Sequence, residues 1–263
     1  MYNPVKPLPH KIVNVKKETD LEYTFRVETK TKVKYGQFLQ LSIPKIGEAP
    51  ISVSDQGIGW LEFTIRNVGK VTNEIFEKKE GDTIFLRGPY GNSWPIEKFK
   101  DKNLVIIAGG TGVSPVRGLI NYLSKNKDYV KSLHLICGFK NKECVLFKED
   151  LKVWASTFNT TFTLDNEESK GFKKGFVTAF IKDIPFNTFG EDYEVIVVGP
   201  PMMMKFSGLE LEKCGVDINK IWMSFERKMS CAIGKCGHCR IDEYYVCLDG
   251  PIFEYRIAKD LID

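Results

Sequence analysis

The chain has 263 residues, enough for two average domains, and a net charge of only +4 from 38 basic and 34 acidic side chains. Basic and acidic side chains are nearly equal in number, which gives no support to a nucleic-acid-binding protein. The sequence has no apolar run of about 18 residues, so we expect no transmembrane helix, and its polar start lacks the apolar core of a signal peptide. Seven cysteines, an odd number, argue against a disulfide framework and favour a reducing cytoplasm.

Period-two patterning runs through the first 99 residues. Apolar and polar side chains alternate in short segments that are separated by glycine and proline, as they do in half-buried strands. The expected strands include Leu21–Val27, Phe38–Ile43, Leu61–Ile65 and Thr83–Leu86. Short strands at this spacing predict a small antiparallel β-barrel.

A possible phosphate site lies after the strand that ends near Ile65. We expect a short helix over Asn73–Lys78 with Thr72 as its N-cap, and Gly69 allows a ligand to approach the backbone closely. Free N–H groups at a helix start suit a phosphate. A glycine followed by such a threonine is usually only a cap, so the pattern alone leaves both interpretations open.

The pattern changes after residue 100. Leu104–Ala108 is a continuous apolar run, which is typical of a buried parallel strand. Gly109–Gly112 follow it, and Ser114 is expected to cap a helix that begins at Pro115. Backbone N–H groups at such a turn receive a pyrophosphate, although the turn is not GxGxxG and close packing alone would also explain it.

Two later strands end in the same way. Leu133–Cys137 is followed by Gly138, and Val195–Val198 is followed by Gly199. In an open parallel sheet, ligands bind beyond the carboxyl ends of the strands. We therefore expect these glycine-bearing ends to meet at one edge of an α/β domain.

Four cysteines near the C-terminus form the most specific motif. Cys231, Cys236 and Cys239 have the spacing C-x4-C-x2-C, and Cys247 lies eight positions further on. Plant-type [2Fe–2S] proteins use this spacing, because four thiolates must converge on two irons within a tightly wrapped loop. Gly234 and Gly237 would permit that loop and allow N–H groups to point at the sulfurs.

Structural zinc is the competing interpretation of this motif. Zinc sites usually combine two C-x2-4-C pairs, and here only Cys236 and Cys239 form such a pair. His238 is available as a further ligand, although four cysteines already suffice. The remaining cysteines, Cys137, Cys144 and Cys214, are isolated and are expected to be structural.

The order of these segments resembles the ferredoxin–NADP⁺ reductase superfamily, and in particular its branch with a C-terminal [2Fe–2S] cluster. That branch includes the electron-transfer subunit of dihydroorotate dehydrogenase, the gamma subunit of sulfhydrogenase and, with the greatest similarity, the family of anaerobic sulfite reductase B subunits. The resemblance spans essentially the whole chain. It is carried by Gly47–Asp55, Ile65–Thr72, Leu86–Asn92, Ala108–Leu119, Val197–Pro201 and the C-terminal stretches ERKMSCAIGKCGHCR and VCLDGPIF.

The resemblance implies an FAD-binding antiparallel β-barrel over residues 1–99, an NAD-binding α/β domain with a parallel sheet over residues 100–224, and a [2Fe–2S]-binding segment over residues 225–263. The implied FAD contacts are Pro50, Ile51, Ser52 and Val53 along the isoalloxazine, Ile65, Arg66 and Asn67 beside it, and Gly69, Lys70, Val71 and Thr72 at the pyrophosphate. The implied NAD contacts are Gly110, Thr111 and Gly112 at the phosphates and Gly199 and Pro200 at the nicotinamide. Cys231, Cys236, Cys239 and Cys247 would hold the cluster, and no side chain is implied as catalytic.

Two positions depart from the pattern of this superfamily. Many members have an arginine where this chain has Ala49, so Arg66 is expected to take over neutralisation of the flavin phosphates. Many also have a cysteine where this chain has Val198, which leaves no thiol at that position beside the nicotinamide.

The resemblance implies a complete electron relay. NADH would reduce FAD, and the cluster would pass single electrons to iron–sulfur and siroheme-bearing subunits of a sulfite reductase. The alternatives are the equivalent subunit of a dihydroorotate dehydrogenase or sulfhydrogenase, and a zinc-stapled binding module without a redox role. NADH is favoured over NADPH because no arginine cluster follows the second parallel strand, although Lys140 and Lys142 lie near it. Asp165 could contact the ribose, but an aspartate after a strand is more often a turn residue.

Overall fold

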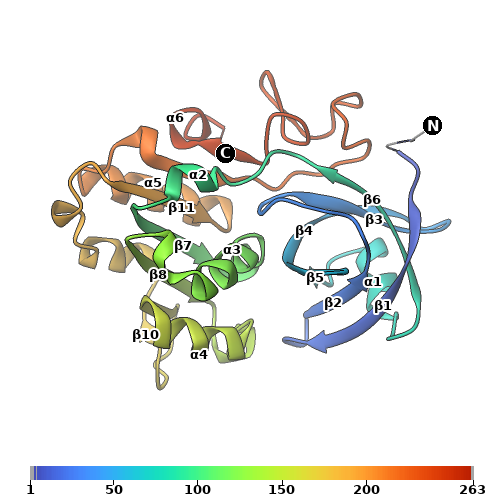
Figure 1. Cartoon of the computed structure of the whole chain (residues 1–263), viewed down its shortest axis with the longest axis horizontal. Coiled ribbons are helices and arrows are strands. Elements are labelled where there is room, and N and C mark those ends of the chain that lie inside the picture. The colour runs from blue at the N-terminus through green and yellow to red at the C-terminus, as the bar shows by residue number, and fades with distance from the viewer. Residues whose placement is uncertain (1–2, 4, 262–263) are drawn as a thin grey trace. The chain divides into compact units, whose positions relative to one another are not determined.

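The computed structural model describes residue 3 and residues 5–261. Contacts divide the chain into two units. The first joins the residues up to Trp94 with Phe225–Ile252, and the second joins Pro95–Ser224 with the residues from Phe253 onward. The cysteine segment therefore belongs to the same unit as the N-terminal strands (Figure 1), and the three-part division at residues 99 and 224 stays a prediction.

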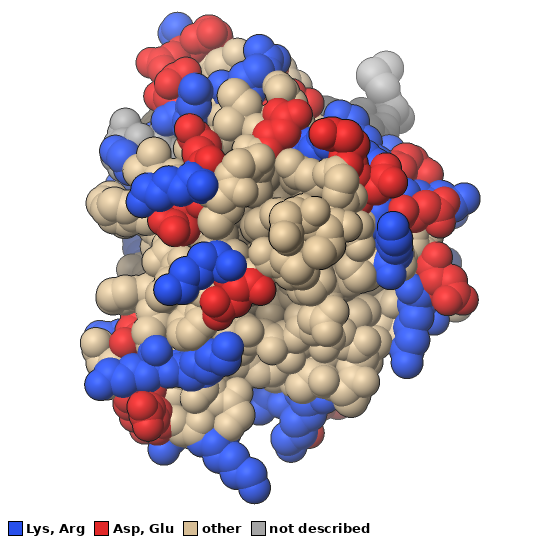
Figure 2. All heavy atoms as spheres, turned by 90° about the vertical axis from the view of Figure 1, so that its left-hand side faces the viewer, with Lys and Arg blue, Asp and Glu red and all other residues tan. Residues whose placement is uncertain are grey.

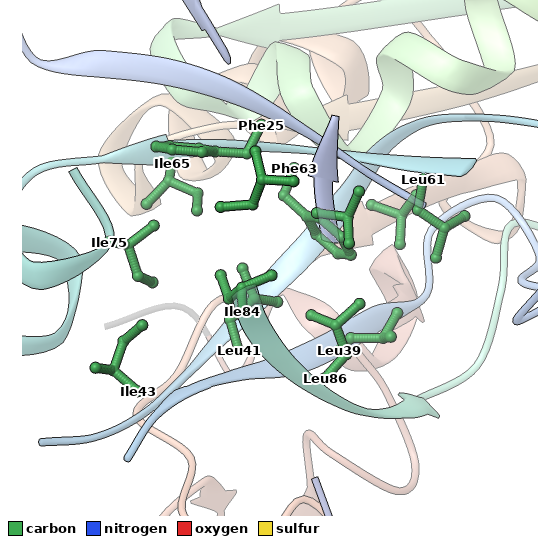
Figure 3. Packing of buried hydrophobic residues seen from close by; sticks show 13 residues of the cluster. Phe25, Leu39, Leu41, Ile43, Leu61, Phe63, Ile65, Ile75, Ile84 and Leu86 are labelled. Carbon is green, nitrogen blue, oxygen red and sulfur yellow. The ribbon is translucent and has the colours of Figure 1, made fainter. Parts of the chain in front are cut away.

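The first unit contains a closed antiparallel barrel, as the sequence predicts. Its strands lie in the spatial order β1-β2-β5-β4-β3-β6. Their bounds are β1 Leu8–Lys17, β2 Glu22–Glu28, β3 Phe38–Ile43, β4 Gly47–Gly57, β5 Trp60–Arg66 and β6 Thr83–Tyr90. Alternate side chains point inward, so Phe25, Phe63 and Ile84 are fully buried in the barrel core (Figure 3).

The helix in the barrel starts earlier than predicted. Helix α1 spans Lys70–Phe76, and Gly69, with an extended backbone, is its N-cap. Thr72 is wrongly predicted as the cap, because it lies inside the first turn. Its hydroxyl reaches back to accept hydrogen bonds from the N–H groups of Val68 and Gly69, at 3.0 and 2.9 Å. A side chain inside the helix therefore organises the loop before it.

The second unit contains a seven-stranded sheet in the order β10-β9-β8-β7-β11-β12-β15. The paired strands from β10 to β12 are parallel. The strands are β7 Asn103–Gly109, β8 Ser132–Phe139, β9 Asn159–Leu164, β10 Lys173–Lys174, β11 Tyr193–Val198, β12 Ile221–Ser224 and β15 Ile252–Glu254. Every residue of β7 and β11 is buried, which confirms the parallel strands predicted from two continuous apolar runs.

The helical elements of this unit lie mostly between its strands. The α-helices are α2 Ile96–Phe99, α3 Ser114–Lys125, α4 Lys148–Thr157, α5 Pro201–Lys213 and α6 Tyr255–Ala258. The 3₁₀ turns are η1 Gly110–Val113, η2 Lys127–Tyr129, η3 Lys142–Cys144, η4 Val177–Asp183, η5 Phe186–Thr188 and η6 Ile218–Lys220. Ser114 is not the predicted N-cap, because η1 already turns the chain and Ser114 becomes the first residue of α3.

The cysteine segment has little regular structure. Its one hairpin pairs β13 (Arg240–Ile241) with β14 (Tyr244–Tyr245), and turns make up most of the rest. Ala232, Gly234 and Gly237 have φ angles of 60°, 72° and 79°, which glycine adopts without strain. The two glycines therefore permit the tight loop that the sequence predicts.

The surface carries charges of both signs. Figure 2 shows a face on which Lys and Arg side chains are mixed with Asp and Glu around an uncharged area. Among the described residues, no helix combines the length and the apolar character that crossing a membrane requires.

Replacing Ile84 with alanine should destabilise the barrel. The side chain is fully buried in the core, so its loss leaves a cavity and should lower the free energy of unfolding by about 2–5 kcal/mol. The matched control is Ile58→Ala in the turn after β4, where the side chain is 103% exposed and the cost should stay within about 0.5 kcal/mol. Urea unfolding of the two variants checks this, and equal losses would contradict the assigned core.

Candidate functional site

The cysteine loop presents backbone N–H groups to its sulfurs. The N–H groups of Ile233, Lys235 and Cys236 donate to Cys231 Sγ at 3.3–3.4 Å. Gly234 N–H donates to Cys247 Sγ at 3.2 Å. These donors are the hydrogen bonds that stabilise thiolates and tune iron–sulfur clusters. The loop therefore has the donor set that a cluster needs.

The four thiols differ in their surroundings. Cys239 and Cys247 are buried, whereas Cys236 is exposed. Backbone hydrogen bonding by Cys231 and then by His238 lowers the pKa of the Cys236 thiol to about 7. Burial raises the pKa of Cys247 to about 12, although the Gly234 N–H acts in the opposite direction. Ionising the Cys247 thiol therefore calls for a bound cation that offsets the cost of burial.

A single-ion site is not preformed in this loop. Among the described residues, no group of three or more His, Cys, Asp and Glu side chains is arranged to hold one metal ion. A [2Fe–2S] cluster takes two thiolates on each iron, so it does not require such a group. The sulfur-directed N–H groups and the glycine-permitted turns fit this cluster.

The end of β6 holds the far end of the cysteine segment. Asn92 donates through Nδ2 to the carbonyl oxygens of Asp249 and Ile252 at 2.9 and 2.7 Å, and its Oδ1 accepts from the Ile252 N–H at 3.0 Å. A Cβ atom at Gly91 would lie 2.6 Å from Pro251 and 2.9 Å from the Gly250 carbonyl. The residues Gly91 and Asn92, part of the stretch Leu86–Asn92 that carries the family resemblance, therefore form one attachment of the barrel to the cysteine segment.

The predicted isoalloxazine segment lies within strand β4, whose pairing with β5 is irregular between Val53 and Asp55. Pro50, Ile51, Ser52 and Val53 lie in the middle of β4, which pairs with β3 and β5. Val53 belongs to the barrel core, and Ile51 packs against it. This leaves the other face of the strand for a ligand.

Unpaired polar atoms lie in this region. Gln40, directly opposite Pro50 on β3, has a fully buried side-chain amide without a hydrogen-bond partner among the described residues. The same holds for Ser54 Oγ and Asn67 Oδ1. Buried polar groups are nearly always hydrogen-bonded in folded proteins. These atoms therefore fit a polar ligand such as the FAD that the sequence predicts.

The remaining predicted FAD residues lie around the end of β5 and the start of α1. Ile65 is fully buried in the barrel core, so only its backbone is available to a ligand. Arg66 is half exposed and lies 3.4 Å from Glu22, with which it forms an ion pair. Lys70 is exposed, and Val71 packs against the barrel core. Thr72 organises the Gly69 turn through the hydrogen bonds described above.

The glycine-bearing strand ends of the second unit meet at one edge of its sheet. Gly109 pairs with Gly138 across β7 and β8, and Val198, just before Gly199, pairs with Ala108. A Cβ atom at Gly112 would lie 2.6 Å from both Gly199 Cα and the Val198 carbonyl oxygen. Only glycine permits the two backbones to approach so closely, which places Gly110, Thr111 and Gly112 beside Gly199 and Pro200.

Met203 is a residue at this edge whose position the sequence does not reveal. Its sulfur would lie 2.3 Å from a Cβ atom at Gly109 and 2.8 Å from one at Gly199. The thioether thus occupies the space that these two glycines leave open. A polarisable sulfur stands at this edge although Val198 carries no thiol.

The other polar candidates of this unit occupy strand ends and turns. Asp165 follows β9, and burial raises the pKa of its carboxyl group, although Lys140 acts in the opposite direction. Its role as a ribose contact stays a prediction. Cys137 is fully buried in β8, and burial raises the pKa of its thiol, as expected of an unreactive structural residue.

Two family models match this chain. The oxidoreductase NAD-binding domain matches residues 106–208, which include the glycine-bearing sheet edge. The iron–sulfur cluster binding domain of dihydroorotate dehydrogenase B matches residues 226–257, which include all four cysteines of the loop.

Curated relatives align along nearly the whole chain. The gamma subunit of sulfhydrogenase 2 from Pyrococcus furiosus is 32% identical and covers 96% of both chains. A probable dihydroorotate dehydrogenase B (NAD⁺) electron transfer subunit from the same organism is 33% identical over 91% of this chain and 85% of its own. The chain belongs to this family of electron-transfer subunits.

Solved structures agree with the family's fold. A chain of an NADH-dependent reduced ferredoxin–NADP oxidoreductase, described in connection with flavin-based electron bifurcation, is 26% identical with a TM-score of 0.78 and covers 97% of this subunit and 89% of its own length. A ferredoxin–NADP⁺ reductase from Neisseria gonorrhoeae with bound FAD and NADP has a TM-score of 0.71 at 20% identity, over 83% of this subunit and 98% of its own. The subunit is thus an NAD-binding oxidoreductase with a ferredoxin–NADP⁺ reductase-like fold and an iron–sulfur domain.

Replacing Cys239 with serine should abolish most iron binding. Cys239 is a buried member of the four-cysteine loop, and a hydroxyl is a poor substitute for a thiolate ligand. Iron analysis of the anaerobically purified variant checks this. The control is Cys144→Ser, in the turn η3, which should keep the iron content of the unchanged protein. Full iron content in Cys239→Ser would contradict the assignment.

Proposed function

We propose that this subunit oxidises NADH through FAD and passes single electrons, through a [2Fe–2S] cluster on Cys231, Cys236, Cys239 and Cys247, to partner subunits. The observation that carries the proposal is the convergence of backbone N–H groups on the sulfurs of Cys231 and Cys247. That arrangement stabilises thiolate ligands, and it lies in a chain that also matches an NAD-binding domain.

The barrel supplies a site suited to FAD. The unpaired amide of Gln40 and the unpaired Asn67 Oδ1 are available for hydrogen bonds to a flavin ring, next to Pro50 and at the end of β5. Thr72 fixes the turn at Gly69, so the turn and the exposed Lys70 would receive the pyrophosphate. Arg66 would add positive charge there in place of the arginine that Ala49 replaces.

The sheet edge of the second unit supplies a site suited to NADH. Gly110, Thr111 and Gly112 would place their backbone N–H groups against the dinucleotide phosphates. Met203 fills the space beside Gly199, and Pro200, the N-cap of α5, follows the end of β11. The side chain of Met203 would have to move out of this space for the nicotinamide ring to enter.

The cofactors supply the redox chemistry, and the protein orients them. When bound, the flavin would take up a hydride from NADH and allow its two electrons to leave singly through the cluster. The residues assigned above bind, orient and shield these groups. None of them is proposed to react itself.

The partner is proposed from the relatives. The curated relatives described above are named as subunits of sulfhydrogenase and dihydroorotate dehydrogenase, and both are about one-third identical along nearly the whole chain. We therefore favour a partner of one of these two types over the siroheme-bearing sulfite reductase that the sequence resemblance suggests. Mass spectrometry of proteins that co-purify with the subunit without oxygen distinguishes the three.

NADH should reduce the purified subunit in two spectroscopically distinct steps. Under anaerobic conditions, NADH should bleach the flavin bands and then produce the electron paramagnetic resonance signal of a one-electron-reduced cluster. NADPH at the same concentration should react more slowly, because no arginine cluster is available for its 2′-phosphate. A colourless protein that retains zinc but no iron would contradict the redox role and support the zinc-stapled module.

Thr72→Val should weaken FAD binding. The substitution keeps the shape of the side chain but removes three hydrogen bonds that order the Gly69 turn, each worth about 1 kcal/mol. Because only part of this free energy is lost specifically from the FAD-bound state, we expect roughly a tenfold lower affinity for FAD. FAD titration followed by flavin fluorescence measures it.

The matched control for this experiment is Thr29→Val. Thr29 also uses its hydroxyl to order a barrel turn, by accepting a hydrogen bond from the Thr31 N–H at 3.1 Å. The Thr29→Val variant should bind FAD with the same affinity as the unsubstituted protein. Equal affinities in the two variants would contradict the assigned pyrophosphate turn.

A further inference from the structure

Arg87, on β6, uses its whole guanidinium group at the junction of the barrel and the cysteine loop. Nε donates to the two carboxylate oxygens of Glu48 at 3.0 and 2.9 Å, and Nη2 donates to Glu48 Oε2 at 2.5 Å. Nη2 also donates to the Ser230 carbonyl oxygen at 2.6 Å. Nη1 donates to the Cys231 carbonyl oxygen at 2.7 Å and to the Tyr90 hydroxyl at 3.0 Å. The five N–H donors of the side chain are thus all engaged.

These contacts bracket one cysteine. The carbonyls of Ser230 and Cys231 belong to the two peptide groups on either side of the Cys231 Cα atom. A planar guanidinium that binds both carbonyls fixes the orientation of both peptides. The backbone after Cys231 then turns so that three N–H groups point back at its sulfur.

The register of the barrel places Arg87 in line with the candidate flavin segment. Gln40 on β3 pairs with Pro50 on β4 and with Arg87 on β6. Directly paired residues present their side chains on the same face of a sheet. One face of the barrel therefore carries, in a single cross-strand row, the predicted flavin contact, an unpaired buried amide and the arginine that holds the cysteine loop.

Arg87 and Glu48 form a charged pair that is largely shielded from water. The side chain of Arg87 is only 4% exposed and that of Glu48 28%. Burial acts to raise the pKa of Glu48, but hydrogen bonds from Arg87 and Ser42 outweigh it and hold the pKa below its usual range. Both groups are therefore charged at neutral pH, and the positive end of the pair faces the cysteine loop.

We propose that Arg87 is a positioning residue for the cluster, which fixes the two peptides around Cys231 and raises the cluster's reduction potential through its positive charge. The inference rests on the proposed cluster and extends it to residues outside the cysteine motif. Reduction adds one electron to the cluster, so a nearby positive charge stabilises the reduced form. Glu48 holds the guanidinium in place and partly offsets its charge.

The two halves of the pair should shift the potential in opposite directions. Arg87→Met removes the positive charge and leaves Glu48 negative, so the midpoint potential should fall. Glu48→Gln removes the negative charge and leaves Arg87 positive, so the potential should rise. A purely structural role gives no reason for opposite signs. Arg87→Lys keeps the charge but not the five-donor geometry. Its midpoint potential should stay close to that of the unsubstituted protein, whereas its electron paramagnetic resonance spectrum should differ.

The test is a potentiometric titration of the full-length, cluster-loaded chain, with dithionite as the electron donor and electron paramagnetic resonance as the readout. The matched control is Arg26→Met, because Arg26 makes a similar ion pair with Glu62, at 2.7 Å, between β2 and β5. The control should leave the cluster potential unchanged.

The outcomes separate this inference from the proposed function. Opposite shifts in Arg87→Met and Glu48→Gln, with no shift in Arg26→Met, support it. Shifts in the same direction, or no shift in either variant, overturn it while the cluster assignment stands. If Arg87→Met does not fold, the Glu48→Gln shift decides alone, and no rise in potential overturns the inference. If the protein without substitutions holds no iron–sulfur cluster, the proposed function and this inference are overturned together.

Discussion

Four thiolates that hold a cluster in one short loop would repel one another, so the fold would have to compensate for that charge. The loop does so from within, through N–H groups that donate to Cys231 and Cys247. From outside the loop, the guanidinium of Arg87 adds positive charge beside Cys231. The neutral amide of Asn92 fixes the other end of the segment through the carbonyls of Asp249 and Ile252. The backbone conformation of the cysteine segment therefore depends on the barrel as well as on the loop, since Arg87 and Asn92 lie far from it in sequence.

This attachment also explains why the barrel and the cysteine segment form one unit by contact. The two ends of the segment are held at different points of β6 and the residues after it, Ser230 and Cys231 by Arg87 and Ile252 by Asn92. Between them, Gly234 and Gly237 take positive φ angles, which glycine adopts without strain.

Local patterns predict the parts of this structure that depend on local physics. Alternating side chains give the barrel strands, and the continuous apolar runs give β7 and β11, because burial on one face or on both leaves a direct trace in the sequence. The cysteine spacing predicts a cluster because the ligands lie close together in the sequence. The curated relatives and the family models then confirm the family and the fold class.

The sequence does not reveal what depends on distant contacts. Arg87 and Cys231 are 144 positions apart, so no spacing rule connects them. The start of α1 is missed because the Thr72 hydroxyl reaches back to order the preceding loop, which differs from an ordinary N-cap. Met203 looks like a core methionine in the sequence, and only the paired ends of β7 and β11 place its sulfur over two glycines.

The most direct test of the central claim is the iron, sulfide and zinc content of the full-length chain purified without oxygen. A [2Fe–2S] cluster on the four cysteines predicts about two irons and about two acid-labile sulfides per chain. About one zinc per chain with no sulfide would contradict the account, because the loop would then hold a structural ion and the chain would have no outlet for single electrons.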